Sequence, residues 1–225
     1  MKKLDIRSIR KSINRDFIDS LDTLEILDSV DSTNNYLLDK TCPELGRYKV
    51  VLTDNQTNGR GRHGRIWCSP RFSGIAISVA YTFVNQPENY APLSLAVGVL
   101  VAKTLQDLGT QKLTLKWPND IIFEDNKLAG ILIERSIRNR FSKTVIVGIG
   151  INYNLTGVKG NFQELLNSTD IFSCCDVLPS RDLLCGSILN YIFLALKKFD
   201  SQGFKVFIND WNELNYLQGK DISVK

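Results

Sequence analysis

The stretch LTLKWPNDIIFEDNKLAGILIERS, residues 113–136, decides the fold class. It holds three strand-like runs in succession, LTLKW (113–117), DIIFE (120–124) and KLAGILIERS (127–136), and Asp125-Asn126 between the last two suits a tight hairpin turn. Strands that follow one another without helices break the alternation that a doubly wound parallel sheet requires. The stretch therefore predicts an α+β fold, with a mixed β-sheet flanked by helices.

Further strand-like and helical runs lie on both sides of this stretch. Strands are predicted at 24–30, 48–54, 74–83 and 143–154. Helices are predicted at 4–20, at 31–38, from Pro92 to Leu108 with Gly109 closing it, from Ser180 to about Phe199, and through Phe204, Phe207, Trp211 and Leu214. The polar run 155–161 is predicted to be a mobile loop, and GKDISVK (219–225) looks like the first strand of a further unit.

Composition limits the function classes. A chain of 225 residues with 43% hydrophobic and 23% charged residues is typical of a folded globular protein. No segment approaches the roughly 18 apolar residues of a membrane span, and no signal core follows the basic amino terminus, so a cytoplasmic protein is expected. Five cysteines without a Cys-x-x-Cys pair predict reduced thiols, and one histidine, His63, argues against a zinc site. A net charge of +4 is too small to indicate nucleic-acid binding by itself.

The stretch QTNGRGRHGRIW (56–67) predicts an anion-binding loop. It places three arginines and three glycines within seven residues. Glycines allow the backbone to approach a ligand closely, and arginines supply planar donors for carboxylate or phosphate oxygens. A solvated basic loop or a nucleic-acid contact explains this stretch equally well when it is taken alone.

Three other short motifs each allow a functional interpretation and a purely structural one. KWPND (116–120) places Lys116 and Asp120 at a strand end, where they suit phosphate and Mg²⁺, or it is only a turn with Trp117 in the core. Lys127 in KLAGILIE is either a catalytic cation or a surface lysine. DSTN (31–34) is either part of a site or only a helix cap.

The order DSTN, GRGRHGR, KWPND, KLAG, GIGIN resembles the biotin protein ligases, and the resemblance covers roughly residues 25 to 220. It implies a catalytic domain related in fold to class II aminoacyl-tRNA synthetases. It also implies a two-step reaction, in which biotin and ATP form biotinyl-5′-adenylate and pyrophosphate. Biotin then passes to a lysine of the biotin carboxyl carrier protein of acetyl-CoA carboxylase. A reaction whose nucleophile is the substrate carboxylate needs no catalytic triad, which fits a cation-rich, histidine-poor loop.

The resemblance assigns roles residue by residue. Lys127, Arg62 and Asp120 are the implied catalytic residues, with Asp120 holding Mg²⁺. The implied biotin-binding residues are Ser32, Thr33, Asn34, Gln56, Gly59, Arg60, Gly61, Arg62, Lys127, Gly130 and Gly148. The implied ATP-binding residues are Arg60, Lys116, Asn119, Lys127 and Asn152. Trp67 is left open as either a lid over the intermediate or a core residue.

Two departures from the family pattern are expected to matter. His63 stands where the family often has an arginine, so one cation of the loop depends on pH. The resemblance also implies a catalytic domain over residues 1–216, with 1–23 as a lead-in, and residues 217–225 as the truncated start of an SH3-like domain. The short lead-in predicts the absence of a DNA-binding module and hence no specific DNA binding. No membrane association is expected. A homodimer is possible, since members of the family occur as monomers or as homodimers.

Three rival readings remain. Lipoate protein ligase shares the adenylation chemistry, but the pairing of DSTN with GRGRHGR favours biotin. A non-catalytic biotin-binding relative should lack Lys127 or Asp120, and both are present. A nucleic-acid-binding module should show a wider basic field with interleaved aromatic residues.

Overall fold

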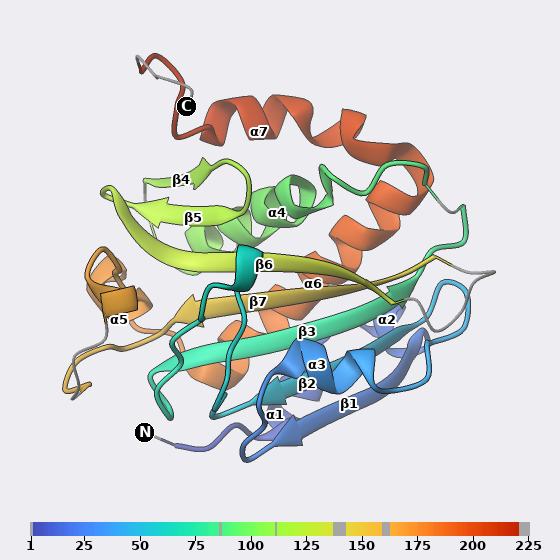
Figure 1. Cartoon of the computed structure of the whole chain (residues 1–225), viewed down its shortest axis with the longest axis horizontal. Coiled ribbons are helices and arrows are strands. Elements are labelled where there is room, and N and C mark those ends of the chain that lie inside the picture. Colours follow the sequence, from blue (N-terminus) through green and yellow to red (C-terminus); the bar gives the residue numbers. More distant parts are fainter. Residues whose placement is uncertain (1, 86, 111, 137–142, 159–162, 221–225) are drawn as a thin grey trace.

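The computed structural model describes residues 2–85, 87–110, 112–136, 143–158 and 163–220 (Figure 1). The described residues form a seven-stranded mixed sheet with the strand order β1-β2-β3-β7-β6-β5-β4. The strands are β1 (Leu21–Leu27), β2 (Tyr48–Thr53), β3 (Gly74–Thr82), β4 (Leu113–Lys116), β5 (Asp120–Phe123), β6 (Asn126–Ser136) and β7 (Thr144–Asn152). β1 and β2 are parallel and the other neighbours are antiparallel, so the predicted α+β class with a mixed sheet is confirmed.

Helices cover both faces of this sheet (Figure 1). The α-helices are α1 (Ile6–Ser12), α2 (Arg15–Ile18), α3 (Thr33–Leu38), α4 (Leu93–Asp107), α5 (Ile171–Cys174), α6 (Arg181–Gln202) and α7 (Ile208–Leu214). Short 3₁₀ turns are η1 (Arg62–Gly64), η2 (Gln163–Leu165) and η3 (Gly203–Phe207). α1, α4 and α6 pack together on one face, whereas α3 packs against β2, β3 and β7 on the other.

Alternation along the central strands explains why both faces are covered. In β2, Val50 and Leu52 point into the large core beneath α4 and α6, while Val51 between them contacts Leu37 of α3. α4 is almost uniformly apolar because it is enclosed between the sheet and α6. The short α3 leaves part of its face of the sheet open, and the site lies there.

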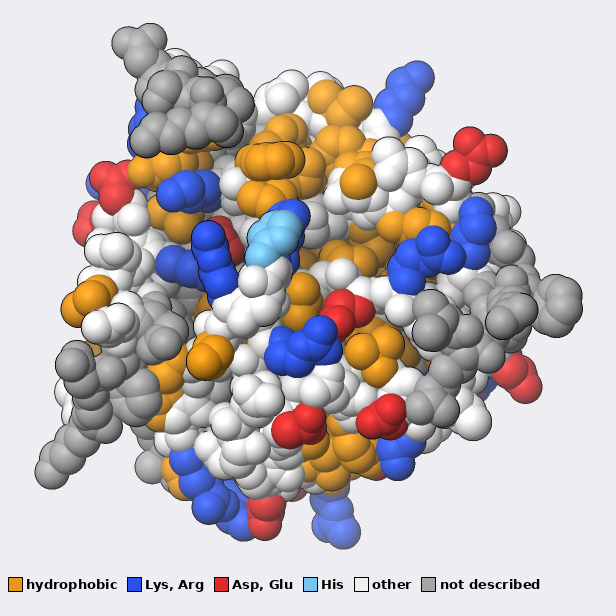
Figure 2. All heavy atoms as spheres, viewed as in Figure 1, with side chains coloured by type: hydrophobic (Ala, Val, Ile, Leu, Met, Phe, Trp, Pro, Cys, Tyr) orange, Lys and Arg blue, Asp and Glu red, His pale blue; other side chains and the backbone are white. Residues whose placement is uncertain are grey.

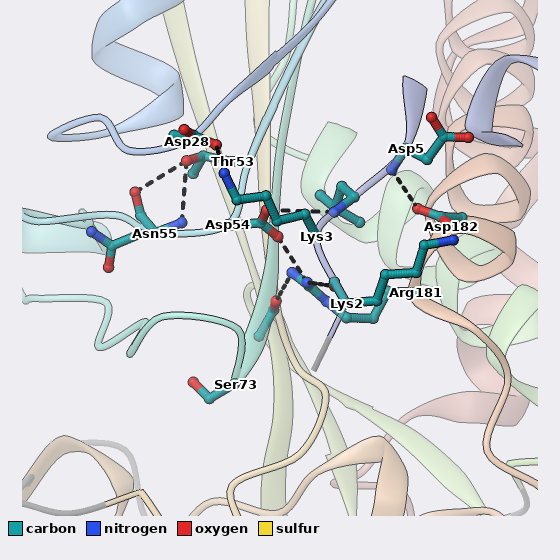
Figure 3. Close-up of polar contacts among 12 residues, drawn as sticks. Lys2, Lys3, Asp5, Asp28, Thr53, Asp54, Asn55, Ser73, Arg181 and Asp182 are labelled. Atoms are coloured by element: carbon teal, nitrogen blue, oxygen red, sulfur yellow. Dashed lines mark hydrogen bonds and ion pairs between the residues drawn. The ribbon is translucent and has the colours of Figure 1, made fainter. Parts of the chain in front are cut away.

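A buried ion pair ties the amino-terminal segment to the sheet (Figure 3). Arg181, the first residue of α6, donates to Asp54 Oδ1 at 2.7 Å, and the two side chains are 6% and 2% exposed. Arg181 also donates to the carbonyl oxygens of Lys2 and Gly74, and Leu4 donates its amide to Asp54. One guanidinium therefore joins the chain start, the end of β2 and the start of β3.

Several predicted boundaries were wrong for local reasons. The helix predicted over 4–20 is two short helices, because Asn14 caps α2 and interrupts the first helix. The first strand spans Leu21–Leu27, so it begins and ends three residues earlier than the predicted 24–30. The β5–β6 turn is centred on Glu124 and Asp125, whose φ values are +46° and +66°, one residue earlier than predicted.

The final helical region starts as the 3₁₀ turn η3 before α7 begins. Of the predicted loop 155–161, residues 159–161 lie outside the described residues, as do residues 221–225 of the predicted terminal strand. Within the described part of the chain, no helix combines the length and apolarity that crossing a membrane requires.

Candidate functional site

A cavity of about 730 Å³ opens on the face of the sheet that carries α3. Its wall is built by the start of α3, the loop 56–68, the β5–β6 hairpin, the second half of β7 and residues 165–168. Figure 2 shows Lys and Arg side chains gathered on this face around the single histidine. The volume suits a small organic ligand.

The fold brings together nearly every residue that the sequence singled out. The predicted residues that line the cavity are Ser32, Thr33, Asn34, Gln56, Arg60, Gly61, Arg62, Lys116, Asn119, Asp120, Lys127, Gly130, Gly148 and Asn152. Gly59 does not line it. A Cβ at Gly59 would lie 2.4 Å from the carbonyl oxygen of Trp67, so this glycine allows two backbone segments to approach each other.

Uncharged polar groups form one end of the cavity. Thr33 donates from its amide and its hydroxyl to Gln56 Oε1, at 2.9 and 3.1 Å. Ser78 of β3, which is fully buried, lies 2.7 Å from the Thr33 hydroxyl and 2.6 Å from Asn34 Oδ1. Ser32 supplies the helix cap by accepting the amide of Asn35. This end therefore offers neutral donors and acceptors held by one another.

Asn34 fills the space beside Gly148. A Cβ at Gly148 would lie 2.3 Å from Asn34 Oδ1, so the glycine makes room for this amide. Asn34 is only 3% exposed, and its Nδ2 donates to Glu134 Oε2 at 2.9 Å. The role of Gly148 in the structure is thus to seat Asn34 within the wall.

The glycine-arginine loop is a small hairpin, here called the Gly59–Trp67 hairpin. The amide of Gly61 donates to Arg65 O at 2.7 Å, the amide of Trp67 donates to Gly59 O at 2.9 Å, and Arg60 pairs with Ile66 between them. η1 forms its tip. The loop is therefore held by its own backbone.

The arginines of this hairpin have different surroundings. Arg60 donates to Glu134 Oε1 at 2.8 Å and also to Asn35 Oδ1. Arg62 is half-buried, lines the cavity and forms no ion pair with any described residue. Of these two arginines, Arg62 is the cation left for a ligand.

Lys127 and Asp120 face each other at the cationic end of the cavity. Lys127 Nζ lies 2.7 Å from Asp120 Oδ1, and the side chains are 33% and 25% exposed. Lys127 Nζ also lies 5.4 Å from the centre of the Trp67 ring. The lysine is thus held between a carboxylate and an aromatic face.

Two paired glycines seat the Trp67 ring. Gly130 of β6 and Gly150 of β7 lie opposite each other in the sheet. A Cβ at Gly150 would lie 2.2 Å from Trp67 Cε2, and one at Gly130 would lie 3.1 Å from Cζ3. Trp67 is therefore a half-buried wall residue of the cavity that rests on sheet backbone, so the reading that places it in the core is wrong.

The Lys127 backbone is fixed by the segment before α5. Its amide donates to Asn167 O at 2.9 Å, and its carbonyl accepts the amide of Thr169 at 3.0 Å. Asn152, which is 3% exposed, donates to the carbonyl oxygens of Lys127 and Thr169 at 3.3 and 3.0 Å. Asn167 and Ser168 thus line the site, although the sequence named no individual residue of this segment.

The outer rim of the cavity is formed by the KWPND turn. Asn119 Nδ2 donates to Ile131 O at 2.9 Å, which fixes the turn against β6. Lys116 is exposed, and its Nζ lies 5.6 Å from the centre of the Tyr216 ring. Trp117 is 64% exposed, so the reading that places it in the core is wrong.

Comparisons with known proteins agree with this geometry. The family model described as biotin/lipoate A/B protein ligase matches residues 26–152, more than half of the chain. The bifunctional ligase/repressor BirA of Escherichia coli is 31% identical over 203 residues, which are 90% of this chain and 62% of that protein. The biotin–[acetyl-CoA-carboxylase] ligase of Paracoccus denitrificans is 38% identical over 133 residues, 56% of this chain and 53% of that protein.

A solved structure of a biotin protein ligase is also similar to this chain. The biotin protein ligase from Aquifex aeolicus in complex with biotin and ATP has a TM-score of 0.72 and 31% identity, and the match covers 87% of this chain and 79% of that one. The chain spans 58% and 62% of the length of two BirA proteins that it matches.

Proposed function

The chain belongs to the biotin/lipoate A/B protein ligase family, and we propose that it is an ATP-dependent biotin protein ligase. In the proposed reaction, biotin and ATP form biotinyl-5′-adenylate and pyrophosphate. The biotinyl group then passes to a lysine of a biotin carboxyl carrier protein, and AMP leaves. The carrier protein of acetyl-CoA carboxylase is the proposed acceptor, because the relative from Paracoccus denitrificans is named biotin–[acetyl-CoA-carboxylase] ligase.

One observation carries the proposal: the cavity has a neutral polar end and a cationic end. Thr33 contacts Gln56 at the first end, and the buried Ser78 supports Thr33 from behind the wall. Lys127 and Asp120 lie at the second, and Arg62 lines the same cavity. Biotin has the matching division, with an uncharged ureido head and a carboxylate tail that must meet a phosphate. Neutral groups suit the head, because a buried charge would need a partner.

The first step requires two anions to meet. A carboxylate oxygen of biotin forms a bond to the α-phosphorus of ATP, and the bond from that phosphorus to the bridging oxygen breaks to release pyrophosphate. Lys127 and Arg62 lower the repulsion between the anions and stabilise the negative charge that develops on the phosphate oxygens. No histidine or nucleophilic side chain is required, since the attacking atom belongs to the substrate.

The second step needs a side chain that orients the amine of the carrier lysine. The neutral amine of the carrier lysine attacks the acyl carbon of the adenylate, the bond from that carbon to the phosphate oxygen breaks with its electron pair leaving on AMP, and the nitrogen releases a proton as the amide forms. We assign Asp120 to orient this amine, because its carboxylate already holds a lysine ammonium at 2.7 Å. Lys127 remains near the leaving phosphate.

The donor set fits a magnesium ion that arrives with the nucleotide. No group of three His, Cys, Asp or Glu residues suited to a metal is present in the described parts of the chain. Magnesium in nucleotide sites commonly takes one or two carboxylates, with phosphate oxygens and water completing the shell. Asp120 would hold the ion at the cationic end, where the ion would neutralise phosphate charge.

The test is pyrophosphate release from ATP and Mg²⁺ with biotin, with lipoate and with neither. We expect release that depends on biotin and is absent with lipoate. Release with lipoate alone would transfer the proposal to the other ligase named in the family description. No release with either acid, despite measurable biotin binding, would favour a non-catalytic relative.

A further inference from the structure

The carboxylate of Glu134 on β6 connects two parts of the cavity wall that are far apart in the sequence. Its Oε1 accepts from Arg60 at 2.8 Å and its Oε2 accepts from Asn34 at 2.9 Å. Its side chain is 19% exposed, whereas the Arg60 side chain is 40% exposed. Each oxygen therefore has its own partner, one on the hairpin and one in the neutral end.

Glu134 orients the Asn34 amide, with a second and longer contact from Asn34 Nδ2 to the carbonyl oxygen of Leu132 at 3.4 Å. A carboxylate accepts only, so the side of the amide that faces Glu134 must be its NH₂ group. The carbonyl oxygen of Asn34 consequently points to Ser78, at 2.6 Å, and lies over Gly148. Ser78 in turn contacts the Thr33 hydroxyl that donates to Gln56. A chain of hydrogen bonds thus runs from Glu134 through Asn34, Ser78 and Thr33 to Gln56.

The contact with Arg60 holds the Gly59–Trp67 hairpin on the sheet. Arg60 also donates to Asn35, whose own amide donates to Asp31 at 2.7 Å. Asn34 and Asn35 are neighbours in the first turn of α3. Arg60 therefore donates both to Glu134 on the sheet and to Asn35 on α3. The hairpin that carries Arg62 and Trp67 is fastened through this arginine.

We propose that Glu134 is a positioning residue of this site, which orients Asn34 and fastens the Gly59–Trp67 hairpin with one carboxylate. It acts through Asn34 and Arg60 and does not itself touch a ligand. Loss of its charge should loosen the hairpin and release the Asn34 amide together. The effect on substrate affinity rests on the proposed function, whereas the effect on the hairpin does not.

The charge-neutral variant Glu134→Gln separates this role from general stability. Gln keeps the length of the side chain but removes the charge that holds Arg60. We expect the KM for biotin to rise about tenfold or more, with a smaller change in kcat. We also expect trypsin to cleave native protein after Arg60, Arg62 or Arg65 several-fold faster, as located by mass spectrometry of the fragments.

A matched control is available on the same sheet and the same helix. Glu25 of β1 accepts the Tyr36 hydroxyl of α3 at 2.7 Å, away from the cavity. Glu25→Gln removes one carboxylate contact to α3 and should leave the KM for biotin and the hairpin cleavage rate unchanged. Equal effects of both variants would overturn the proposal and leave Glu134 as a general contact of α3.

A double-variant cycle completes the test. If Glu134 acts through Arg60, then Arg60→Gln combined with Glu134→Gln should accelerate cleavage after Arg62 or Arg65 no more than the stronger single variant. Multiplicative effects would contradict the coupling. Hairpin cleavage needs no catalysis, so a wild-type protein without ligase activity would refute the proposed function while the cycle still decided the role of Glu134.

Discussion

Lys127 Nζ lies 2.7 Å from Asp120 Oδ1, across the β5–β6 hairpin. Asp120 lies on β5 and Lys127 lies on the neighbouring strand β6. Asp120 pairs in register with Gly130, three residues after the lysine. This pair puts an ammonium and a carboxylate at one point in the cavity wall. A phosphate that enters must therefore meet a cation already held by an anion.

The first prediction concerns this lysine. Lys127→Ala should lower kcat/KM for biotin-dependent pyrophosphate release by about 10²–10³, because it removes a preorganised cation from the charge that develops at the phosphate. Lys103→Ala is the control, since Lys103 forms a surface ion pair with Asp210 outside the cavity. A Lys127→Ala rate within about threefold of wild type would exclude the lysine as a major source of transition-state stabilisation.

The second prediction concerns the seat of Asn34. Gly148→Ala places a methyl group 2.3 Å from Asn34 Oδ1, so the amide must move. We expect weaker biotin binding by calorimetry and a loss of about 1–3 kcal/mol in the free energy of unfolding from overpacking.

Gly98→Ala in α4 is the matched substitution for this test. Its Cβ would meet Ile131 Cδ1 at 3.4 Å, an ordinary contact, and alanine favours a helix over glycine by about 0.5–1 kcal/mol. We expect unchanged or raised stability and unchanged biotin affinity. Unchanged affinity in Gly148→Ala as well would separate Asn34 from biotin binding.

The third prediction compares two ion pairs of the amino-terminal region (Figure 3). Arg181→Met leaves Asp54 buried without its cation and should lower the free energy of unfolding by about 3–5 kcal/mol, measured by urea titration. Lys3→Met breaks the exposed pair with Asp28, where both side chains are more than half exposed, and should have no measurable effect. Similar losses in the two variants would mean that burial does not set the strength of these contacts.

The fourth prediction concerns alkaline pH. Burial raises the pKa of the Cys174 thiol from 9.0 to about 11, and burial also raises the pKa of Cys185. Above pH 9 the unfolded chain releases these protons while the folded chain keeps them, so the free energy of unfolding should fall as pH rises from 9 towards 11. Each thiol contributes at most about 1.4 kcal/mol per pH unit.

Tyrosines add to this effect at higher pH. Burial raises the pKa of Tyr48, and burial together with the hydrogen bond to Asp200 raises the pKa of Tyr81. Urea titrations between pH 9 and 10 therefore report the thiols together with the start of the tyrosine titration, since the pKa values of Tyr90, Tyr153 and Tyr191 are also raised. A Cys174→Ala, Cys185→Ala protein should show a shallower loss over that interval, and an identical slope would assign the loss to other groups.

Local signals in the sequence were sufficient for much of the site. Ser180 caps α6 where that helix was predicted to begin, and Ser32 of the DSTN stretch, which suited a helix cap, caps α3. The glycine-arginine, KWPND and KLAG motifs lie in three separate segments, yet the resemblance to the biotin protein ligases implied that they form one site, and residues of all three line the cavity. These features could be predicted because each depends on a few neighbouring residues or on a complete motif.

The residues that were missed depend on sheet register. Ser78 lies within an apolar run, and only the pairing of β3 with β7 places its hydroxyl against Asn34. Glu134 follows Gly130 and Leu132 at alternate positions of β6, so its side chain shares their face, but which face becomes the cavity is set by α3. Gly150 became recognisable only once Trp67 was seen to lie on it.

The closed form of the Gly59–Trp67 hairpin has a consequence for substitutions at its tip. His63 lies beyond the last backbone bond between the two arms, is exposed, and has a φ of +55°. The backbone of this chain at this position therefore suits residues that tolerate a left-handed conformation, such as Asn, Asp, Gly and His. Substitutions at the tip are thus limited by backbone conformation, whereas substitutions of Arg60 and Trp67, on the arms, are limited by the contacts these side chains make.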